Sequence, residues 1–499
     1  MNIFQEHFFW TDTVMSNINE KTCAILFGGI GGATVGYMRS QVEYGGQLYR
    51  FKILCSIDYD PVACHNHDLV AGENTSIEMD LFRHWQYVAW HGKQPPSEWS
   101  EKTPWDIWVA FNYQVPFFLF TSPPCKGLTG LLPEEKSKSE KYQALNHLTV
   151  SGLELSLEAC LQYGGDVPAI IQLENVPRIT SRGKPLLQQI KKLLKRYGYA
   201  VSIRADHNLG EVGGLGQNRI RFLILARQES QIPNFIYYPE KKKLKNIGDI
   251  LASLPAPNDN NKGGPLHRLP NLQWKTWLRL ALIPAGGNWR NLNDIEYGNL
   301  LVSQDSNFES ISDISLNIGG HGKTNLLRVQ PFKEAAVCVT GAAGPHQGAA
   351  CISDERINGY TNTFRIHHLN ELCELNNIGN LHREGIHELP AAHERGTWVI
   401  IAQDGTWHRP LTTYELAVLQ SFPMLLPDGR PFQLEGCTDA KAREYIGNAY
   451  PPLAAEQTGN VILLAAAEAE AGISFSLGFE PVWVAPIEEV EDLGVVTYH

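Results

Sequence analysis

The sequence lacks the features of a membrane protein and of a disulfide-rich protein. No apolar run approaches the roughly 18 residues needed to span a bilayer, and VPFFLF at 115–120 is far too short. The nine cysteines include no Cys-x-x-Cys pair, which argues against a disulfide framework or a zinc ribbon. The N-terminal MNIFQEHFFWTD has no basic segment ahead of an apolar one, so we expect no signal peptide. With 43% hydrophobic and 19% charged residues, we expect a globular, cytoplasmic protein rather than a disordered one.

The negative charge is unevenly distributed along the chain. The formal net charge is −11, and the segment from Glu468 to the C-terminus has seven acidic residues and no Lys or Arg. Residues 182–245, in contrast, hold fourteen Lys and Arg against four Asp and Glu. Because binding to a polyanion depends on the local field, the acidic total does not exclude a nucleic-acid partner. An ordinary solvated helix and loop would explain the basic stretch as well.

Short apolar segments alternate with helical ones in the first half of the chain. The segments that read as buried strands are CAILF (23–27), FKILCSI (51–57), VPFFLF (115–120), AIIQL (169–173), AVSIRA (200–205) and RFLILA (221–226). Helical spacing occurs between them, for example in LLQQIKKLLKRYG, which Gly198 ends. This alternation predicts a doubly wound, mostly parallel α/β sheet of the Rossmann-like type, whose ligands bind at the carboxyl ends of the strands.

The pattern weakens between residues 230 and 408, where Gly, Pro and Asn are frequent, and we expect an inserted, irregular, mainly β domain there. A helix is expected again at 411–422, with Thr412 or Thr413 as its N-cap, and PPLAAEQTGNVILLAAAEAE follows as a further helix. The expected division is an N-terminal extension (1–20), a first catalytic part (21–229), the inserted domain (230–408), a catalytic return segment (409–470) and an acidic tail (471–499).

Residues 82–114 do not fit the alternation. They contain five of the twelve tryptophans among polar residues: Trp85, Trp90, Trp99, Trp105 and Trp108. We expect an additional packed layer here rather than an aromatic binding surface.

A glycine-rich turn, FGGIGGATVG, follows the first expected strand and opens a helix. Glycines let the backbone turn tightly and approach a ligand closely. Asp58 ends the second strand, where a carboxylate can accept hydrogen bonds from both hydroxyls of a ribose. The combination indicates an adenosine-bearing cofactor without saying which one. Asp80, in EMDL, either belongs to the same pocket or caps a loop.

Three further segments place reactive side chains at strand ends. Cys125, in TSPPCKGLTG, lies on a loop after VPFFLF, and Glu174, in IIQLENVPR, ends the next strand. Neighbouring parallel strands would bring this thiol and carboxyl to one cleft. Arg219 and Arg221, in GLGQNRIRFLILA, are two residues apart and so face the same side of the sheet. Structural ion pairing is the alternative for the charged residues, and a buried structural role is the alternative for the cysteine.

The run FGGIGG, PPC, ENV, QNRIR, LTTYELAVLQSFP and IGNAYPP resembles, in this order, the DNA cytosine carbon-5 methyltransferase family. The resemblance covers residues 23–227 and 409–465, and 230–408 falls where that family keeps its target-recognition domain. It implies S-adenosylmethionine as the cofactor, double-stranded DNA as the partner, and a monomer. The residues implied at the cofactor are Phe27, Gly29, Gly31, Gly32, Asp58, Tyr59, Asp80, Leu81, Pro123, Asn448 and Ala449.

The same resemblance implies the catalytic roles. Cys125 would attack carbon 6 of a cytosine flipped out of the helix, which turns carbon 5 into a nucleophile for the methyl group. Glu174 would hydrogen-bond or protonate ring nitrogen 3, and Arg221, with Arg219 beside it, would contact the base. This chemistry needs no metal, and we expect none. The departures from the family pattern are Gly28, Lys126, Leu128, Thr129 and Tyr450, none of which is a reacting group.

Two other readings stay open. An RNA enzyme that takes its nucleophile from a Thr-Cys motif is disfavoured, because that position reads LENV here. The tRNA-methylating branch of the family is generally shorter, and the long inserted region favours duplex DNA. A binding protein without catalysis would be attractive only if Cys125, Glu174 or Arg221 had been replaced. The implied setting is bacterial or phage DNA modification, as an orphan enzyme or with a cognate restriction endonuclease that acts on the same site without being bound.

Overall fold

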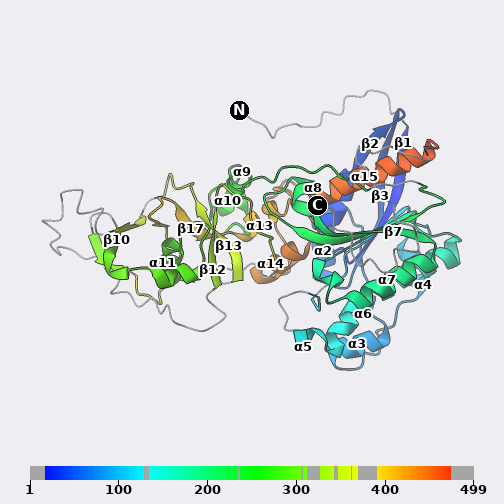
Figure 1. Cartoon of the computed structure of the whole chain (residues 1–499), viewed down its shortest axis with the longest axis horizontal. Coiled ribbons are helices and arrows are strands. Elements are labelled where there is room, and N and C mark those ends of the chain that lie inside the picture. Colours follow the sequence, from blue (N-terminus) through cyan, green and yellow to red (C-terminus); the bar gives the residue numbers. More distant parts are fainter. Residues whose placement is uncertain are drawn as a thin grey trace.

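The chain forms two lobes in the computed structural model (Figure 1). The residues described are 17–124, 126–128, 134–233, 237–304, 307–311, 326–341, 347–360, 362–368 and 390–473. Within these ranges, no helix has the length and apolarity that crossing a membrane requires. The lobe on the right of Figure 1 contains the first sheet, and the lobe on the left contains the second.

Eight strands form the first sheet, in the order β2-β3-β1-β5-β6-β8-β7, with β4 paired to β3. They are β1 (Ile18–Leu26), β2 (Gln41–Tyr44), β3 (Gln47–Asp58), β4 (Ser76–Glu78), β5 (Phe118–Thr121), β6 (Ile170–Asn175), β7 (Tyr199–Asn208) and β8 (Ile220–Gln228). All six segments predicted as strands lie in it. Strands β4, β3, β1, β5 and β6 pair in parallel, whereas β8 is antiparallel to both β6 and β7.

Helices cover both faces of this sheet. The helices of this lobe and of the return segment are α1 (Gly32–Arg39), α2 (Pro61–Ala71), α3 (His84–His91), α4 (Pro104–Ala110), α5 (Glu134–Ser137), α6 (Glu140–Ala159), α7 (Lys184–Arg196), α8 (Leu209–Gly213), α13 (Thr413–Leu419), α14 (Asp439–Asn448) and α15 (Pro452–Glu470). Two short helical turns complete the set, at Cys160–Gly164 and Pro177–Thr180, and a further turn, Trp289–Asp294, lies in the other lobe.

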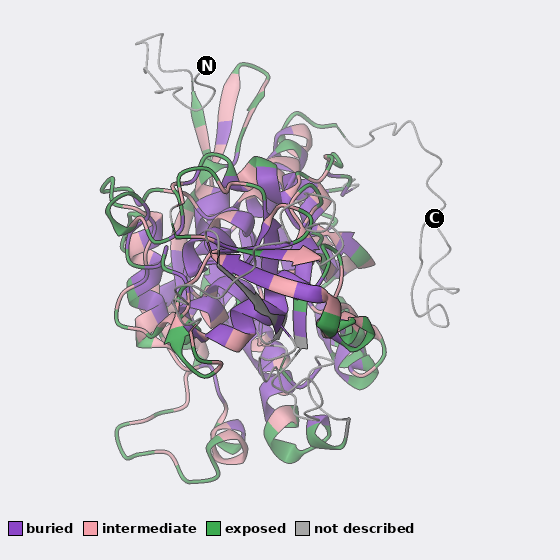
Figure 2. Cartoon of the chain, turned by 90° about the vertical axis from the view of Figure 1, so that its left-hand side faces the viewer, coloured by how far each residue is buried: buried purple, intermediate pink, exposed green. Residues whose placement is uncertain are grey.

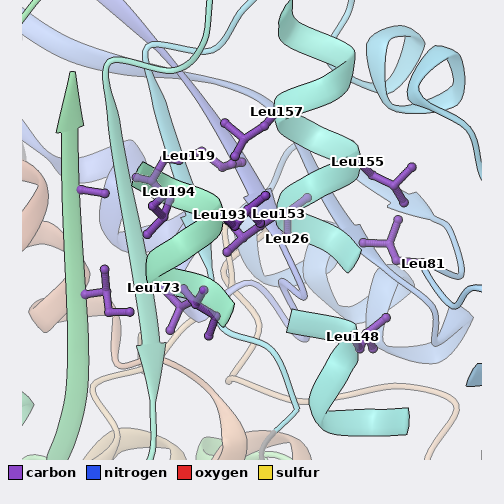
Figure 3. Packing of buried hydrophobic residues seen from close by; sticks show 14 of the residues in the cluster. Leu26, Leu81, Leu119, Leu148, Leu153, Leu155, Leu157, Leu173, Leu193 and Leu194 are labelled. Carbon is purple, nitrogen blue, oxygen red and sulfur yellow. The ribbon is translucent and has the colours of Figure 1, made fainter. Parts of the chain in front are cut away.

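The alternation of side chains along β1 separates two hydrophobic clusters. Ala24 and Leu26 belong to a cluster that includes α6 and α7, whereas Cys23 and Ile25 belong to one that includes α1 and α15. Figure 3 shows the first cluster, with side chains of α6 and α7 packed against the sheet at Leu26, Leu119 and Leu173. The sheet is therefore doubly wound, and the predicted α/β class is confirmed. Cys23 is fully buried inside its strand, as expected of a structural cysteine, and burial raises the pKa of its thiol.

The second sheet has seven strands, in the order β11-β10-β14-β16-β17-β13-β12. These are β10 (Leu300–Gln304), β11 (Asn307–Ser310), β12 (Leu326–Pro331), β13 (Gln347–Asp354), β14 (Phe364–His368), β16 (Ile400–Ile401) and β17 (Trp407–Pro410). The remaining elements of this region are the β9–β15 pair (Leu272–Gln273 and Arg395–Gly396), α9 (Ile247–Leu251), α10 (Asn260–Gly263), α11 (Trp274–Leu282) and the turn Tyr297–Asn299. Trp274, Trp277 and Trp407 are fully buried in its core. Figure 2 shows that buried residues occupy the interior of the molecule. The predicted domain boundaries remain predictions.

The helix after the second sheet begins as its sequence indicates. Thr412 is the N-cap of α13, and it forms a capping box with Glu415, which also lies in a buried ion cluster. The Arg409 guanidinium contacts Glu415 Oε1 at 2.6 Å and Asp354 Oδ2 at 2.7 Å, and all three side chains are almost completely buried. This cluster joins β13, β17 and α13, and so ties the second sheet to the return segment.

Replacing Glu415 with glutamine is expected to destabilise the protein by about 3–5 kcal/mol, because it leaves the Arg409 charge buried with half of its compensation. Burial acts to raise the pKa of Glu415, but Arg409 outweighs it and lowers the pKa to about 2. The stabilisation from this carboxylate is therefore present above its ordinary pKa of 4.5 and is lost as the pH falls toward 2. Urea unfolding at pH 7 and pH 3 would measure both effects. The control is Glu435→Gln, at a half-exposed carboxylate; an equal loss of stability there would contradict the prediction.

Residues 82–114 form the expected packed layer. Helices α3 and α4 both pack against α6, below and beside it in Figure 1. Gln86 of α3 anchors the layer, because its side-chain amide donates to Ala144 O at 3.3 Å and accepts from Ser151 Oγ at 3.2 Å, both on α6. Trp90, Trp99 and Trp108 pack on the hydrophobic cluster of α6, whereas Trp85 and Trp105 are half exposed.

Candidate functional site

The glycine-rich turn joins β1 to α1 at the carboxyl edge of the first sheet. Gly31 is the N-cap of α1 with φ 84°, a conformation that favours glycine. Gly28 is glycine for a different reason: a Cβ there would lie 1.8 Å from Ser56 Oγ, so the Ser56 hydroxyl occupies the space of a side chain. A Cβ at Gly29 would meet nothing within 4 Å, so the backbone at Gly29 faces open space. Gly32 packs closely on Tyr450 O of the return segment.

Asp58 is next to this turn, at the end of β3. Its carboxylate accepts from the backbone N–H of Gly29 at 2.9 Å and of Asp60 at 3.1 Å. Burial raises the pKa of Asp58, although these N–H donors act to lower it. Tyr59 follows with 65% of its surface exposed. Phe27, the residue before the turn, lies against Gly152 of α6.

Asp80 lies just after β4, and both of its oxygens are engaged. Oδ1 accepts from the backbone N–H of Phe82 at 2.9 Å, and Oδ2 accepts from the indole Nε1 of Trp99 at 3.0 Å. Leu81, which lies between Asp80 and Phe82 in the chain, is buried in the hydrophobic cluster of α6. The first bond is the loop cap that the sequence allowed for, and the second joins Asp80 to the aromatic layer.

The return segment approaches the same edge of the sheet through α14. Ala449, which ends this helix, has a carbonyl that accepts from Arg219 Nη2 at 3.0 Å and from Gln420 Nε2 at 2.7 Å. Asn448 is exposed, and its side chain lies beside Gly341 of the inserted region. Pro123 is buried in the loop after β5.

These residues fit an adenosyl cofactor. The glycine turn leaves space above its backbone, and a carboxylate that can accept from ribose hydroxyls lies beside it. Asp58, predicted at the ribose, is the last residue of β3, and Asp80, predicted at the adenine, follows β4. Strands β3 and β4 are parallel neighbours, so the two carboxylates lie at the same edge of the sheet. The lone pairs that the two carboxylates keep beside their present hydrogen bonds are acceptors of the kind that a nucleoside satisfies.

Glu174 ends β6 and is 9% exposed. Its Oε1 pairs with Arg221 Nε at 2.9 Å, and its Oε2 accepts from Ser122 Oγ at 2.8 Å. Ser122 follows β5, which pairs in parallel with β6, so the two strand ends bring the hydroxyl and the carboxyl together. Arg221 reaches the same point from the start of β8, because β8 is antiparallel to β6. The carboxyl group is thereby held in one orientation by donors from both neighbouring strands.

Arg219 has a different environment from Arg221. Its guanidinium is fully buried and donates to the carbonyls of Val339 at 2.9 Å and of Gly447 and Ala449 at 3.0 Å. Burial and the nearby Arg221 charge lower the pKa of Arg219 to about 10. The side chain therefore joins the inserted region to the return segment directly behind Arg221.

Cys125 itself lies outside the described residues, but its neighbours in sequence do not. It is three residues beyond Ser122, which bonds Glu174. Lys126, one of the departures from the family pattern, pairs with Glu444 of α14 at 3.0 Å. Thr129 also lies outside the described residues, whereas Leu128 is buried.

Cys338 lies at this site, although nothing in its sequence context singles it out. Its sulfur lies 3.4 Å from Arg219 Nη1 and 3.8 Å from both terminal nitrogens of Arg221. Burial acts to raise the pKa of this thiol, but the two guanidinium groups outweigh burial and lower it. Ser122 was also missed, although its position directly after a strand and shortly before Cys125 was a usable signal.

Gln217 is a third residue of this site, after Cys338 and Ser122, that was not predicted from the sequence. Its side chain accepts from Val339 N at 2.9 Å and donates to Leu419 O at 2.9 Å and Gln420 Oε1 at 2.5 Å. These bonds link the loop before β8 with the inserted region and with α13. They hold in place the segment that carries both arginines.

The histidines near the predicted cofactor residues are not arranged as metal ligands. Across the described ranges, no group of three or more His, Cys, Asp and Glu side chains could hold a metal ion. The run Cys64-His65-Asn66-His67 contains two histidines, and His67 is not solvated. It is buried, with its ring nitrogens 2.8 Å from Thr34 Oγ1 and 3.0 Å from Asp68 Oδ1, because α2 turns it against α1.

The fold is of the Rossmann-like methyltransferase class. The family model for C-5 cytosine-specific DNA methylases matches residues 159–463, which include Glu174, Arg219 and Arg221. The chain belongs to this C-5 cytosine-specific DNA methylase family. The matched range begins after the glycine-rich turn and after Cys125. The chain has no match among curated proteins.

Solved structures similar to this chain are methyltransferases of low sequence identity. The Entamoeba histolytica methyltransferase EhMeth is 14% identical, with a TM-score of 0.49, over 91% of this chain and 99% of that one. The S. pombe Dnmt2 methyltransferase is 15% identical, with a TM-score of 0.44, over 90% and 98% of the two chains. A putative DNA modification methyltransferase encoded within an E. coli prophage is 14% identical, with a TM-score of 0.43, over 89% and 98%.

Proposed function

We propose that the protein is a DNA cytosine-5 methyltransferase that transfers a methyl group from S-adenosylmethionine to a flipped cytosine in double-stranded DNA through a covalent Cys125 adduct. The observation that carries this proposal is the Glu174 carboxyl, held by Ser122 and Arg221 at the strand edge where the Cys125 loop begins. A carboxyl group fixed between two donors, beside a cysteine loop, suits addition of a thiolate to a pyrimidine ring.

In the proposed reaction, the Cys125 sulfur forms a bond to carbon 6 of cytosine, and the electron pair of the 5,6 double bond moves to carbon 5. Carbon 5 would then bond to the methyl group that bound S-adenosylmethionine would supply, with S-adenosylhomocysteine as the leaving group. Transfer of the proton from carbon 5 to a water molecule then expels the Cys125 thiolate and restores the 5,6 double bond. Glu174 contacts ring nitrogen 3 and lowers the cost of the negative charge that the first addition creates. Arg221 contacts the base and keeps Glu174 in place.

The proposed cofactor residues are the eleven predicted from the sequence, in three groups. The turn at Gly29, Gly31 and Gly32, with Asp58 and Tyr59, would hold the ribose and its surroundings. Asp80 and Leu81 would lie at the adenine, with Phe27 against the ring. Asn448 and Ala449, with Pro123, would close the pocket from the return segment and the Cys125 loop. Arg219 is proposed as a positioning residue, because its guanidinium bonds to backbone carbonyls.

Double-stranded DNA is proposed as the substrate on two grounds. The inserted region contributes a whole second sheet beside the site, which offers more surface than recognition of a single base requires. Residues 182–245 add a local excess of basic side chains, including the solvent side of α7. We propose that the enzyme is a cytoplasmic monomer that associates with the nucleoid and modifies bacterial or phage DNA. A cognate restriction endonuclease would act on the same site without binding this chain.

The test is incubation of the purified protein with methyl-tritiated S-adenosylmethionine and either unmethylated phage DNA or tRNA. Label in DNA that is recovered as 5-methylcytosine supports the proposal, and bisulfite sequencing then locates the modified site. Label in tRNA alone would replace DNA with tRNA as the substrate. No label in either, by a protein that still binds S-adenosylhomocysteine, would contradict the enzymatic function.

Replacing Ser122 with alanine is expected to lower kcat about ten-fold and leave the KM for S-adenosylmethionine unchanged. The hydroxyl donates to Glu174 Oε2, and a hydrogen bond to a charged group contributes about 1.5–3 kcal/mol. Steady-state kinetics on a DNA substrate measure both constants. Ser181→Ala, which removes a hydroxyl that donates to a local carbonyl on an exposed turn, serves as the control. A change in the cofactor KM without a change in kcat would contradict the role.

A further inference from the structure

The aromatic layer at residues 82–114 is a feature of this chain to which the proposed reaction gives no role. Most of its large side chains are accounted for by packing on α6 or by exposure to solvent. Trp99 differs, because its ring packs in the layer while its indole N–H leaves the layer and donates to Asp80. Asp80 follows a strand at the edge of the sheet where the cofactor is proposed to bind.

The two hydrogen bonds to Asp80 fix the plane of its carboxylate. The backbone N–H of Phe82 holds Oδ1 at 2.9 Å, and Trp99 Nε1 holds Oδ2 at 3.0 Å. Each carboxylate oxygen has two lone-pair sites, so each keeps capacity for one more donor. An ionised carboxylate only accepts, and the adenine ring offers one amino group as a matching donor. A fixed carboxylate at this position therefore suits recognition of that amino group.

Trp99 is held rigidly enough to perform this task. Its ring packs on Tyr87 of α3, with the ring centroids 4.9 Å apart, and its backbone N–H donates to Pro96 O at 3.0 Å. Two residues later, Glu101 accepts from the backbone N–H of His84 at 2.7 Å and pairs with Arg83 at 3.1 Å. The loop that carries Trp99 is therefore bonded to the start of α3 through Glu101, and it packs on the middle of α3 through the ring of Trp99.

The anchoring continues from α3 into the core of the catalytic lobe. Helix α3 is bonded to α6 through Gln86. Leu81, directly after Asp80, packs in the same cluster as Leu148 and Leu155 of α6, and Figure 3 shows it beside Leu155. Asp80 and Trp99 are therefore mounted on one rigid body, with a hydrogen bond between them.

We propose that Trp99 is a positioning residue for cofactor recognition: its indole N–H orients Asp80 to accept from the 6-amino group of the adenine ring. The aromatic layer at residues 82–114 then forms the wall of the cofactor site at its adenine end. This inference rests on the proposed function, since that function places an adenosyl group beside Asp80. It assigns recognition of the adenine ring to the aromatic layer, whereas the glycine turn lies at the ribose end of the cofactor.

Trp99→Phe tests the proposal, because phenylalanine keeps an aromatic ring but has no N–H. Titration calorimetry would compare S-adenosylhomocysteine with S-inosylhomocysteine, in which an oxo group replaces the 6-amino group. Trp99→Phe is expected to weaken binding of the adenosyl ligand about ten-fold and to leave binding of the inosyl ligand unchanged. The preference between the two ligands therefore falls about ten-fold. The control is Trp105→Phe, at a half-exposed tryptophan of the same layer that packs on Tyr113 and Tyr163, and it should leave both affinities unchanged.

A second variant separates positioning from support of the fold. Asp80→Asn should lose the same preference with Trp99 intact, and adding Trp99→Phe to it should have no further effect. An equal weakening of both ligands by Trp99→Phe would show loosened packing and overturn the inference, as would an unchanged preference. Wild-type protein that binds the adenosyl ligand without preference overturns the inference alone. Wild-type protein that binds neither ligand overturns the proposed function and the inference with it.

Discussion

Replacing Cys125 with alanine is expected to reduce methylation of DNA by at least about 10³-fold, because no other group supplies the covalent step in the proposed reaction. Binding of DNA and of S-adenosylhomocysteine should be retained, since the thiol contributes chemistry rather than contact area. Transfer of tritium from the methyl donor measures the rate, and a filter-binding assay measures DNA affinity. DNA that contains 5-fluorocytosine gives a direct readout, because the fluorine cannot leave as a proton does and the adduct to the wild-type protein persists.

Two other cysteines make this experiment selective. Cys437, half-buried before α14, is the control, and Cys437→Ala should methylate at the wild-type rate. Cys338 is the competitor, because it lies against Arg219 and Arg221 and their charges lower the pKa of its thiol. The assignment of Cys125 would be wrong if Cys125→Ala turned over at the wild-type rate and Cys338→Ala lost the adduct instead. Cys338 would then be the nucleophile.

Glu174→Gln is expected to lower kcat about 10²–10⁴-fold, the range in which a positioned acid or base contributes to catalysis. The amide has nearly the shape of the carboxyl group and can still accept from Ser122, but it cannot pass a proton to ring nitrogen 3. The ion pair with Arg221 is lost as well, so the thermal midpoint should be measured alongside the rate. A variant that is folded, binds DNA and turns over slowly is the expected result.

The strand that carries Arg221 offers a matched control for Glu174. Glu229, just beyond the far end of β8, pairs with Arg227 at 3.1 Å and is exposed. Glu229→Gln removes an ion pair of the same residue types at the opposite edge of the sheet, and it should leave kcat unchanged. A near-normal rate for Glu174→Gln, or equal losses in the two variants, would remove the catalytic role of Glu174.

Local patterns were sufficient for the parts of the fold that depend on neighbouring residues. The six apolar segments are strands, the glycine turn caps α1 through Gly31, and Thr412 caps α13, as their sequences indicate. These features follow from backbone conformation and from the burial of short segments, which a sequence shows directly. Helix α6, in contrast, was not anticipated, although it carries much of the core and supports the aromatic layer.

Strand direction was outside the reach of the sequence. The segment of Arg221 reads as one more buried strand, but only the sheet shows that β8 is inserted antiparallel between β6 and β7. That reversal puts the start of β8 at the edge where β6 ends, and so puts Arg221 on Glu174. Apolar periodicity is the same for both directions, because side chains alternate with period two either way.

The sequence by itself determined which reactive groups this protein has and on which strand ends they lie, because strands, turns and caps are encoded within a few residues. Only the tertiary structure decided how they are used: that Arg219 bonds to backbone carbonyls, that Cys338 lies against both arginines, and that Trp99 holds Asp80. Arg219 is more than a hundred residues away in the chain from both Val339 and Cys338, which it contacts. Such contacts are selected by how the sheets and helices pack, and no local pattern carries that information.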